Sequence, residues 1–169
     1  GLISGLDWFP TFLAAAGDPN IVDELKAGKD LNGTNYKVHL DGYDQTDLIT
    51  GAGPTKRHEI WYFVETNLGG LRLDEFKFRF FDQPDGWPGP KVPLNMPIMV
   101  NIKQDPFERT PSTNLLEGAP GYMDMFMARE FWRFVYVQQK VAALAQTAIE
   151  FPPMQKGASF NLAAVKAQI

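Results

Sequence analysis

Apolar residues in the segment 59–103 occur in short runs that either are continuous or alternate with polar residues. Residues 60–64 are all apolar or aromatic, residues 76–80 alternate between phenylalanine and a basic residue, and residues 98–102 alternate again. A period of two is typical of a β-strand, and the phenylalanines are predicted to share the buried face. With the glycine pair 69–70 predicted in a tight connection, the pattern indicates a small antiparallel sheet of about four strands.

A helical pattern follows over residues 122–149, which contain neither Gly nor Pro. Apolar residues recur there on one predicted helical stripe, at Phe126, Phe134, Val137, Val141, Leu144 and Ala148. This spacing predicts a long helix that covers the sheet. Residues 123–136 carry further apolar side chains outside that stripe, which favours contact with more than one neighbour.

The first third of the chain is predicted to be mainly helical. Residues 7–17 combine an early proline, an alanine run and a closing glycine, which predicts a short helix, apolar on most sides and buried against another body. A second helix is predicted over 21–27 and a third over 45–50. Between them, the sequence indicates a turn at 32–34 and a brief strand at 36–40.

Five prolines surround Trp87 between residues 82 and 97. Proline lacks the backbone donor that regular strands and helices need, so we expect an irregular loop. Aromatic residues on long loops often contact ligands, although packing within the protein is the simpler interpretation. Trp87 is therefore the candidate residue for the lining of a cleft.

Composition and charge exclude several classes of function. The 169 residues are 44% hydrophobic and 21% charged, as in a globular domain, and no apolar run approaches the roughly 18 residues of a membrane span. The formal charge of −4 is spread along the chain, so no nucleic-acid interface and no membrane partner is predicted. The chain contains no cysteine, which excludes disulfides, thiolate metal sites and cysteine nucleophiles.

Few residues offer candidate chemistry. His39 and His58 lack metal-ligand spacing. His58 precedes Glu59, but neighbouring strand residues point to opposite faces, so we interpret it as a surface histidine rather than half of an acid/base pair. Three aspartates within 41–47 lack the closing Glu of a calcium loop and are interpreted as helix-capping or solvated groups. No serine lies beside a recognisable base, so we predict no catalytic and no metal-binding residue in this chain.

Several segments in a fixed order carry a family resemblance. They are 6–17, 40–51, 57–63, 71–78 and 101–109. The first is similar to an Asp-hydrophobic-hydrophobic-Pro-Thr helix, and the last, Asn-Ile-Lys-Gln-Asp-Pro-Phe-Glu, is similar to an Asn-Leu-x-x-Asp-Pro-x-Glu turn. Together they resemble the C-terminal region of a type I sulfatase of the arylsulfatase family, within the alkaline-phosphatase-like superfamily.

The resemblance implies an α+β fold and a two-part organisation. Residues 1–53 are expected to be the C-terminal, helical remnant of a large α/β sulfatase domain. Residues 54–169 are expected to form a subdomain of antiparallel sheet, long helix and tail. The fold expected from the resemblance thus agrees with the sheet and the helix that the residue pattern predicts.

The resemblance also implies that the parent enzyme hydrolyses sulfate esters with calcium and a formylglycine made from a Cys/Ser-x-Pro-x-Arg motif. The chain has no cysteine, no Ser-x-Pro-x-Arg and no Asp-Asp pair. Calcium and formylglycine are therefore expected in an N-terminal part that precedes Gly1, and this chain alone is expected to be inactive. That N-terminal sulfatase domain is the expected partner, with a homo-oligomer as the alternative, and the family suggests a periplasmic or secreted location.

Two other functions stay open. The chain could be a self-standing, non-enzymatic α+β binding module with its ligand at the Trp87 loop. It could also be the C-terminal part of a related phosphoryl hydrolase, whose nucleophile would be Thr, Ser or Cys without formylglycine. The sequence that encodes any preceding residues distinguishes these hypotheses, because only the sulfatase requires Cys/Ser-x-Pro-x-Arg.

Overall fold

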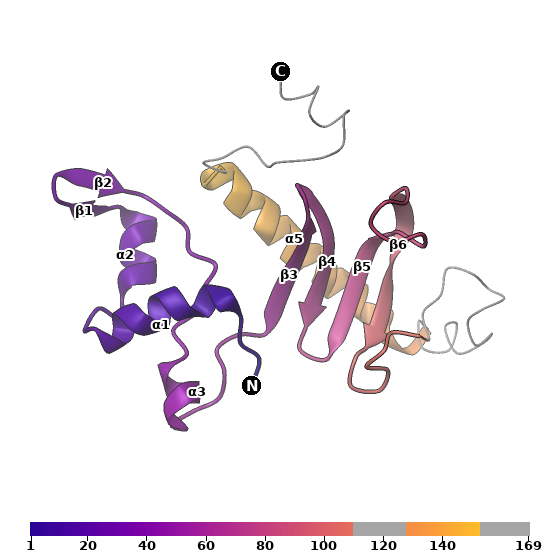
Figure 1. Cartoon of the computed structure of the whole chain (residues 1–169), viewed down its shortest axis with the longest axis horizontal. Coiled ribbons are helices and arrows are strands. Elements are labelled where there is room, and N and C mark those ends of the chain that lie inside the picture. Colours follow the sequence, from indigo (N-terminus) through magenta and orange to yellow (C-terminus); the bar gives the residue numbers. More distant parts are fainter. Residues whose placement is uncertain (110–127, 153–169) are drawn as a thin grey trace, which may run out of the picture. The chain divides into compact units, whose positions relative to one another are not determined.

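A computed structural model describes residues 1–109 and 128–152 of the chain (Figure 1). These residues form two compact units, which are described separately below. Unit 1 comprises residues 1–58 and 147–152, and unit 2 comprises the described residues between 59 and 146. Within the described ranges, no helix is long and apolar enough to cross a membrane. The division at residue 53 that the resemblance implies concerns a larger enzyme and stays a prediction.

Unit 2 contains a four-stranded antiparallel sheet, as the alternating pattern predicted. Its strands are β3 (Glu59–Val64), β4 (Asn67–Leu73), β5 (Phe76–Asp82) and β6 (Val92–Asn101), in the order β3-β4-β5-β6 (Figure 1). Phe76 and Phe78 are buried on one face and Phe80 packs against the same core, which confirms the face predicted for the phenylalanines. With the helices of the chain, the sheet confirms an α+β fold.

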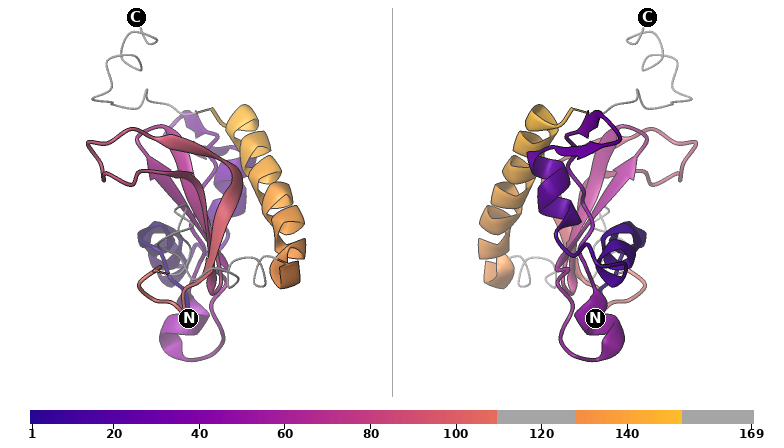
Figure 2. Two further views of the ribbon diagram at one scale, coloured as in Figure 1. Left: turned by 90° about the vertical axis from the view of Figure 1, so that its right-hand side faces the viewer. Right: turned by 90° about the vertical axis from the view of Figure 1, so that its left-hand side faces the viewer.

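Helix α5 (Trp132–Glu150) lies along one face of this sheet (Figure 2). Phe134 and Val137 are buried in the same core as the sheet residues, and Val141 packs against it, which confirms the first half of the predicted stripe in α5. In the second half, Leu144 is only partly buried and Ala148 is exposed. The predicted single helix over 122–149 is interrupted, because a turn at Phe131 separates the helical residues 128–130 from α5. Residues 122–127 lie outside the described part of the chain.

The proline-rich segment is more regular than the sequence indicated. We predicted no regular structure between residues 82 and 97, yet β6 begins at Val92 and includes Pro93 and Pro97. Because β6 lies at the edge of the sheet, it needs backbone partners on one side only, and prolines are tolerated where no donor is required. Only residues 83–91 form an irregular connection.

The glycine pair 69–70 does not form the connection that we predicted. The turn between β3 and β4 is made by Glu65 and Thr66, and both glycines belong to β4. A Cβ atom on Gly70 would lie 2.5 Å from the Phe78 carbonyl oxygen of β5. Glycine is therefore required there by the close approach of a neighbouring backbone.

Unit 1 consists of short elements. They are the 3-10 helix η1 (Gly5–Asp7), α1 (Trp8–Ala15), α2 (Ile21–Ala27), β1 (Lys29–Leu31), β2 (Thr34–Tyr36) and α3 (Thr46–Thr50). The three predicted helices are present, but the strand predicted over 36–40 is wrong. Instead β1 and β2 form a hairpin around Asn32 and Gly33, which have φ angles of 52° and 84°. Two positive φ angles are typical of the tight turn that Asn-Gly favours between antiparallel strands.

In this chain the aromatic side of α1 is exposed, and its predicted burial against another body stays a prediction. Its exposed aromatic residues are Trp8, Phe9 and Phe12, the last of which is 63% exposed, whereas Pro10 and Thr11 are buried. The Thr11 hydroxyl donates to the Asp7 carbonyl oxygen at 2.6 Å, and its oxygen accepts the Gln45 backbone N–H at 3.0 Å. The helix thus turns its small polar side inward, and its aromatic side is exposed.

The centre of unit 1 is a buried ion pair between Asp7 and Arg57, which are 0% and 3% exposed. Arg57 Nη2 and Nε donate to the Asp7 carboxylate at 2.6 and 2.9 Å, and Nη2 also reaches the Asp41 carbonyl oxygen at 2.7 Å. Burial alone would raise the pKa of Asp7, but hydrogen bonds from Arg57 and from the Tyr43 and Ser4 backbone N–H groups outweigh it and lower the pKa. Asp7 is therefore held as a carboxylate, and it joins segments that lie far apart in sequence.

Candidate functional site

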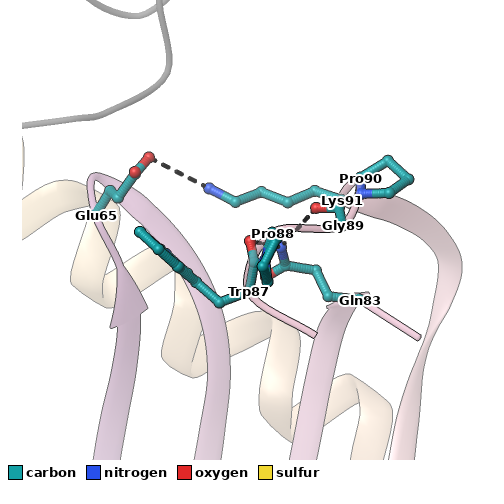
Figure 3. A pocket seen from close by; sticks show the side chains of 7 residues that line it. All are labelled: Glu65, Gln83, Trp87, Pro88, Gly89, Pro90 and Lys91. Carbon is teal, nitrogen blue, oxygen red and sulfur yellow. Dashed lines mark hydrogen bonds and ion pairs between the residues drawn. The ribbon is translucent and has the colours of Figure 1, made fainter. Parts of the chain in front are cut away.

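The candidate site is a hollow at one end of the unit 2 sheet. In an antiparallel meander, the first and third connections lie at the same end, so the β3–β4 turn meets the β5–β6 connection. The hollow has a volume of about 530 Å³. Its lining residues, shown in Figure 3, are Glu65, Gln83, Trp87, Pro88, Gly89, Pro90 and Lys91. We refer to it as the Trp87 hollow.

The loop that carries Trp87 is held by its own hydrogen bonds. The Gln83 side-chain amide donates to the Gly89 carbonyl oxygen at 3.1 Å and to the Trp87 carbonyl oxygen at 3.4 Å. Two tight turns complete the loop, because Gly86 N–H donates to the Gln83 carbonyl oxygen and Gly89 N–H donates to that of Gly86. Gly86 has a φ of 73°, which glycine adopts without strain. These bonds and the flanking prolines fix the loop before any ligand arrives.

The charges at the Trp87 hollow are balanced. Lys91 Nζ lies 3.5 Å from the Glu65 carboxylate, and both side chains are partly buried. The same ammonium lies 5.6 Å from the centre of the Phe81 ring, a cation–π distance. Trp87 itself is 65% exposed, and its ring extends toward the turn that carries Glu65 (Figure 3). The hollow therefore combines an accessible aromatic surface with one cation and one anion.

The titratable side chains that line this hollow are Glu65 and Lys91. Its lining includes no Ser, Thr, Cys or His, so it offers no hydroxyl or thiol nucleophile and no imidazole base. Nowhere in the ranges 1–109 and 128–152 do three His, Cys, Asp or Glu side chains form a group that could hold a metal ion. The described residues thus do not fit a calcium ion, which stays a prediction for a preceding polypeptide.

The other candidate side chains have local partners. His39 Nδ1 lies 3.3 Å from Asp41, and Glu59 pairs with Lys140 Nζ at 3.1 Å. Asp44 accepts the Thr46 backbone N–H at 2.9 Å, but the N-cap of α3 is Gln45, whose side chain makes no capping hydrogen bond, so Asp44 is not the predicted helix cap. None of these four acidic and histidine side chains lines the Trp87 hollow.

The segment most similar to the sulfatase pattern, 101–109, forms a structural turn. The Asn101 side-chain oxygen accepts the Lys103 and Gln104 backbone N–H groups at 3.0 and 3.3 Å. Glu108 has a positive φ of 51°, and its carboxylate accepts from Lys77 Nζ at 2.6 Å. The motif residues Asn and Glu thus close the turn after β6 and attach it to the polar face of β5.

Three residues of the hollow, Glu65, Gln83 and Lys91, were not among our candidates. No pattern in sequence links Glu65 to the Trp87 loop, because about twenty residues and two strands lie between them. The available signal was topological. Once an antiparallel meander is predicted, alternate connections must meet at one end of the sheet, and their polar residues become candidates together.

A second hollow, of about 480 Å³, lies within unit 1. Its lining is mainly apolar and consists of Phe9, Leu13, Asp18, Ile21, Leu25, Lys29, Leu31, Tyr36, Val38 and Leu40. Lys29 is paired with Asp18 at 2.5 Å and with Glu24, so the cation at its edge is already neutralised. Phe9 links this hollow to the exposed aromatic side of α1.

Comparison with known proteins supports the fold. No protein-family model matches the sequence, and no curated protein matches it. Among solved structures, the chain is similar to the PsFucS1 sulfatase from Pseudoalteromonas sp., with a TM-score of 0.54 and 18% sequence identity. The match covers 70% of this chain and 23% of that sulfatase, so the chain spans about a quarter of its length. The two proteins share a fold over the matched part.

Proposed function

We propose that this chain is the sulfatase-like C-terminal region of an enzyme that hydrolyses sulfate esters. The observation that carries the proposal is the fold shared with part of a sulfatase over 70% of the chain. The order of the five similar segments, which ends in the turn at 101–109, supports the same assignment independently. In this role unit 2 is a supporting subdomain, and the Trp87 hollow borders the substrate cleft.

The chain does not supply the reactive groups of such an enzyme. It contains no cysteine and no Ser-x-Pro-x-Arg from which a formylglycine could be made. In a type I sulfatase, a formylglycine hydrate provides the nucleophile and calcium neutralises the sulfate oxygens. Both groups are assigned to residues that precede Gly1. What this chain contributes is binding and support.

The aromatic side of α1 is proposed to pack against that catalytic polypeptide. Trp8 and Phe12 stack with ring centres 5.4 Å apart, and both are exposed, as is Phe9. Contiguous exposed apolar surface of this kind marks interaction sites in soluble proteins. A likeness to only 23% of a sulfatase leaves most of such an enzyme to act as the partner. Without it, we expect copies of this chain to associate through the same surface.

The test is an assay of two polypeptides on 4-nitrophenyl sulfate with added calcium. One is the 169-residue chain, and the other is the longer product of the same gene. We expect no turnover from the former, turnover from the latter, and an in-frame Cys/Ser-x-Pro-x-Arg motif before Gly1. Calcium-dependent turnover by the 169-residue chain alone would contradict the proposal. Turnover of 4-nitrophenyl phosphate in place of the sulfate would identify the parent as a phosphoryl hydrolase.

One observation favours a second candidate, a self-standing binding module. All residues that line the Trp87 hollow belong to unit 2, so a ligand could bind there without a catalytic domain. The gene distinguishes the two candidates. A reading frame that starts directly at Gly1 would favour the module, whereas a longer frame with the formylglycine motif would favour the sulfatase.

A further inference from the structure

We propose that the Trp87 hollow binds an uncharged sugar ring, so that the substrate class of the parent enzyme is a sulfated glycan whose neighbouring residue occupies this hollow. The inference deepens the proposed function, and it rests on that function for the claim that the bound sugar is part of a substrate. The binding itself depends only on residues of unit 2.

The first argument is the surface of Trp87. A pyranose ring presents C–H groups on one face, and the electron-rich face of an indole attracts such weakly positive hydrogens. Trp87 is 65% exposed and stands at a hollow rather than on a flat surface, so a ring can pack on it while its edge reaches other groups. Pro88 and Pro90 extend the apolar surface beside it without adding charge.

The second argument is the polar pair at the edge of the hollow. A sugar hydroxyl both donates and accepts a hydrogen bond, so a carboxylate beside an ammonium suits it. Glu65 accepts hydrogen bonds, and Lys91, whose Nζ lies 3.5 Å from the Glu65 carboxylate, carries three N–H donors. Adjacent hydroxyls of one ring could therefore bond to both side chains while the ion pair is kept.

The balance of charge selects an uncharged ring. One cation and one anion line the hollow, so a sulfate placed there would gain from Lys91 and be opposed by Glu65. A flat aryl group would use the surface of Trp87 but leave the polar pair unused and partly desolvated. A sugar ring without sulfate matches both halves of the hollow, and the sulfate that is cleaved would lie elsewhere.

The third argument is that the loop is fixed in advance. The Gln83 amide is occupied by the Gly89 and Trp87 carbonyl oxygens, so Gln83 positions the loop instead of contacting the ligand. A loop that does not need to be ordered loses less free energy on binding. This compensates for the few contacts that a single sugar ring can make.

The experiment is saturation-transfer NMR on the 169-residue chain with the methyl glycosides of galactose, glucose, mannose and fucose as probes. We expect transfer to at least one glycoside, strongest at the C–H hydrogens of one ring face. Trp87→Ala should weaken binding roughly ten-fold, and Lys91→Met roughly three-fold. Raising NaCl from about 0.05 M to about 0.5 M should leave the affinity unchanged, because the ligand carries no charge.

The matched control is Trp132→Ala, which removes another tryptophan of unit 2 that is 59% exposed but does not line the hollow. This variant should bind the glycosides as the unchanged chain does. Circular dichroism of both tryptophan variants verifies that they are folded.

Three results would overturn the inference. They are no transfer to any of the four glycosides, transfer that survives Trp87→Ala, and binding only of galactose 6-sulfate with an affinity that falls with salt. A failure here is separable from failure of the proposed function. If the longer polypeptide cleaves sulfate esters but no glycoside binds, only this inference is wrong. If glycosides bind at Trp87 and the longer polypeptide cleaves no sulfate ester, the hollow belongs to a binding module.

Discussion

In unit 2 the fully buried side chains of the sheet and of α5 are apolar, whereas in unit 1 they include two charged groups and two neutral polar ones. Leu71, Phe78 and Met99 are nearly inaccessible at the centre of unit 2. The corresponding places in unit 1 are held by Asp7, Thr11, Gln45 and Arg57. The buried apolar side chains of unit 1 are Pro10, Ile21 and Leu25.

This difference separates two ways of fixing a fold. An apolar core is stabilised roughly in proportion to the area that it buries. A buried ion pair gives little net stability, but it is strongly destabilising when one partner is lost, since the other is left unpaired. Unit 2 therefore has the apolar core that is typical of an independent domain, whereas unit 1 is centred on a buried polar network and has an exposed aromatic side on α1.

The largest expected effect comes from Asp7→Ala, which would leave the buried guanidinium of Arg57 without its carboxylate. We expect a loss of about 3–5 kcal/mol in the free energy of unfolding of unit 1. Hydrogen exchange should become faster in α1 and α2, with exchange in β3–β6 unchanged. Asp47→Ala, which removes an exposed carboxylate of the same unit, is the control. Equal acceleration in both units would show that they do not unfold separately.

Leu71→Ala is expected to lower the stability of unit 2 by a similar or smaller amount. Leu71 is 0% exposed in the unit 2 core, and removal of a buried leucine side chain costs about 2–5 kcal/mol. Hydrogen exchange should become faster in β3–β6 and stay unchanged in α1. Leu31→Ala, at an exposed position, should change stability by less than about 0.5 kcal/mol. If the two leucine variants were equally stable, the apolar core would not be what holds unit 2.

The contrast also explains which parts of the fold could be predicted. The sheet of unit 2 follows from the alternation of Phe76, Phe78 and Phe80, because an apolar core is encoded locally by periodicity. The pair between Asp7 and Arg57 could not be found in this way, since fifty residues separate its members and hydrophobic periodicity does not link them. The turn predicted at Gly69-Gly70 is wrong, because both glycines lie in a strand where atoms of neighbouring strands approach closely.

The candidate site was predicted only in part for the same reason. Trp87 was noticed because prolines surround it, and it does line a hollow. Its role at a substrate cleft is still a prediction. Glu65 and Lys91 are brought together by the topology of the sheet, which single-sequence patterns do not encode residue by residue.

Acid is expected to lower the free energy of unfolding of unit 1, by less than Asp7→Ala does. The pKa of Asp7 is lowered in the folded chain, so its stabilising contribution is complete above the ordinary aspartate pKa of about 3.9. The contribution is lost as the pH falls from there through the lowered pKa of the folded state, because the unfolded chain then binds the proton more readily. Denaturant midpoints should be constant from neutral pH to about pH 5 and fall below about pH 4.

An Asp7→Asn variant provides the comparison for this acid effect. It lacks the titrating carboxylate, so its already lower stability should depend less on pH in the same range. Parallel pH profiles for the two chains would assign the acid sensitivity to other carboxylates.

The smallest effect on stability, and the most direct test of the open side of unit 1, is expected from Phe12→Ser. Phe12 is 63% exposed and lies outside the buried polar network, so stability should change by no more than about 0.5 kcal/mol. If the aromatic side of α1 mediates association, light scattering should show a larger mass for the unchanged chain than for Phe12→Ser. Phe107→Ser, at a residue 76% exposed in the turn after β6, should behave like the unchanged chain. If the unchanged chain is a compact monomer at every concentration, the exposed aromatic residues on α1 do not bind a second copy. The catalytic polypeptide would then be their one remaining proposed partner.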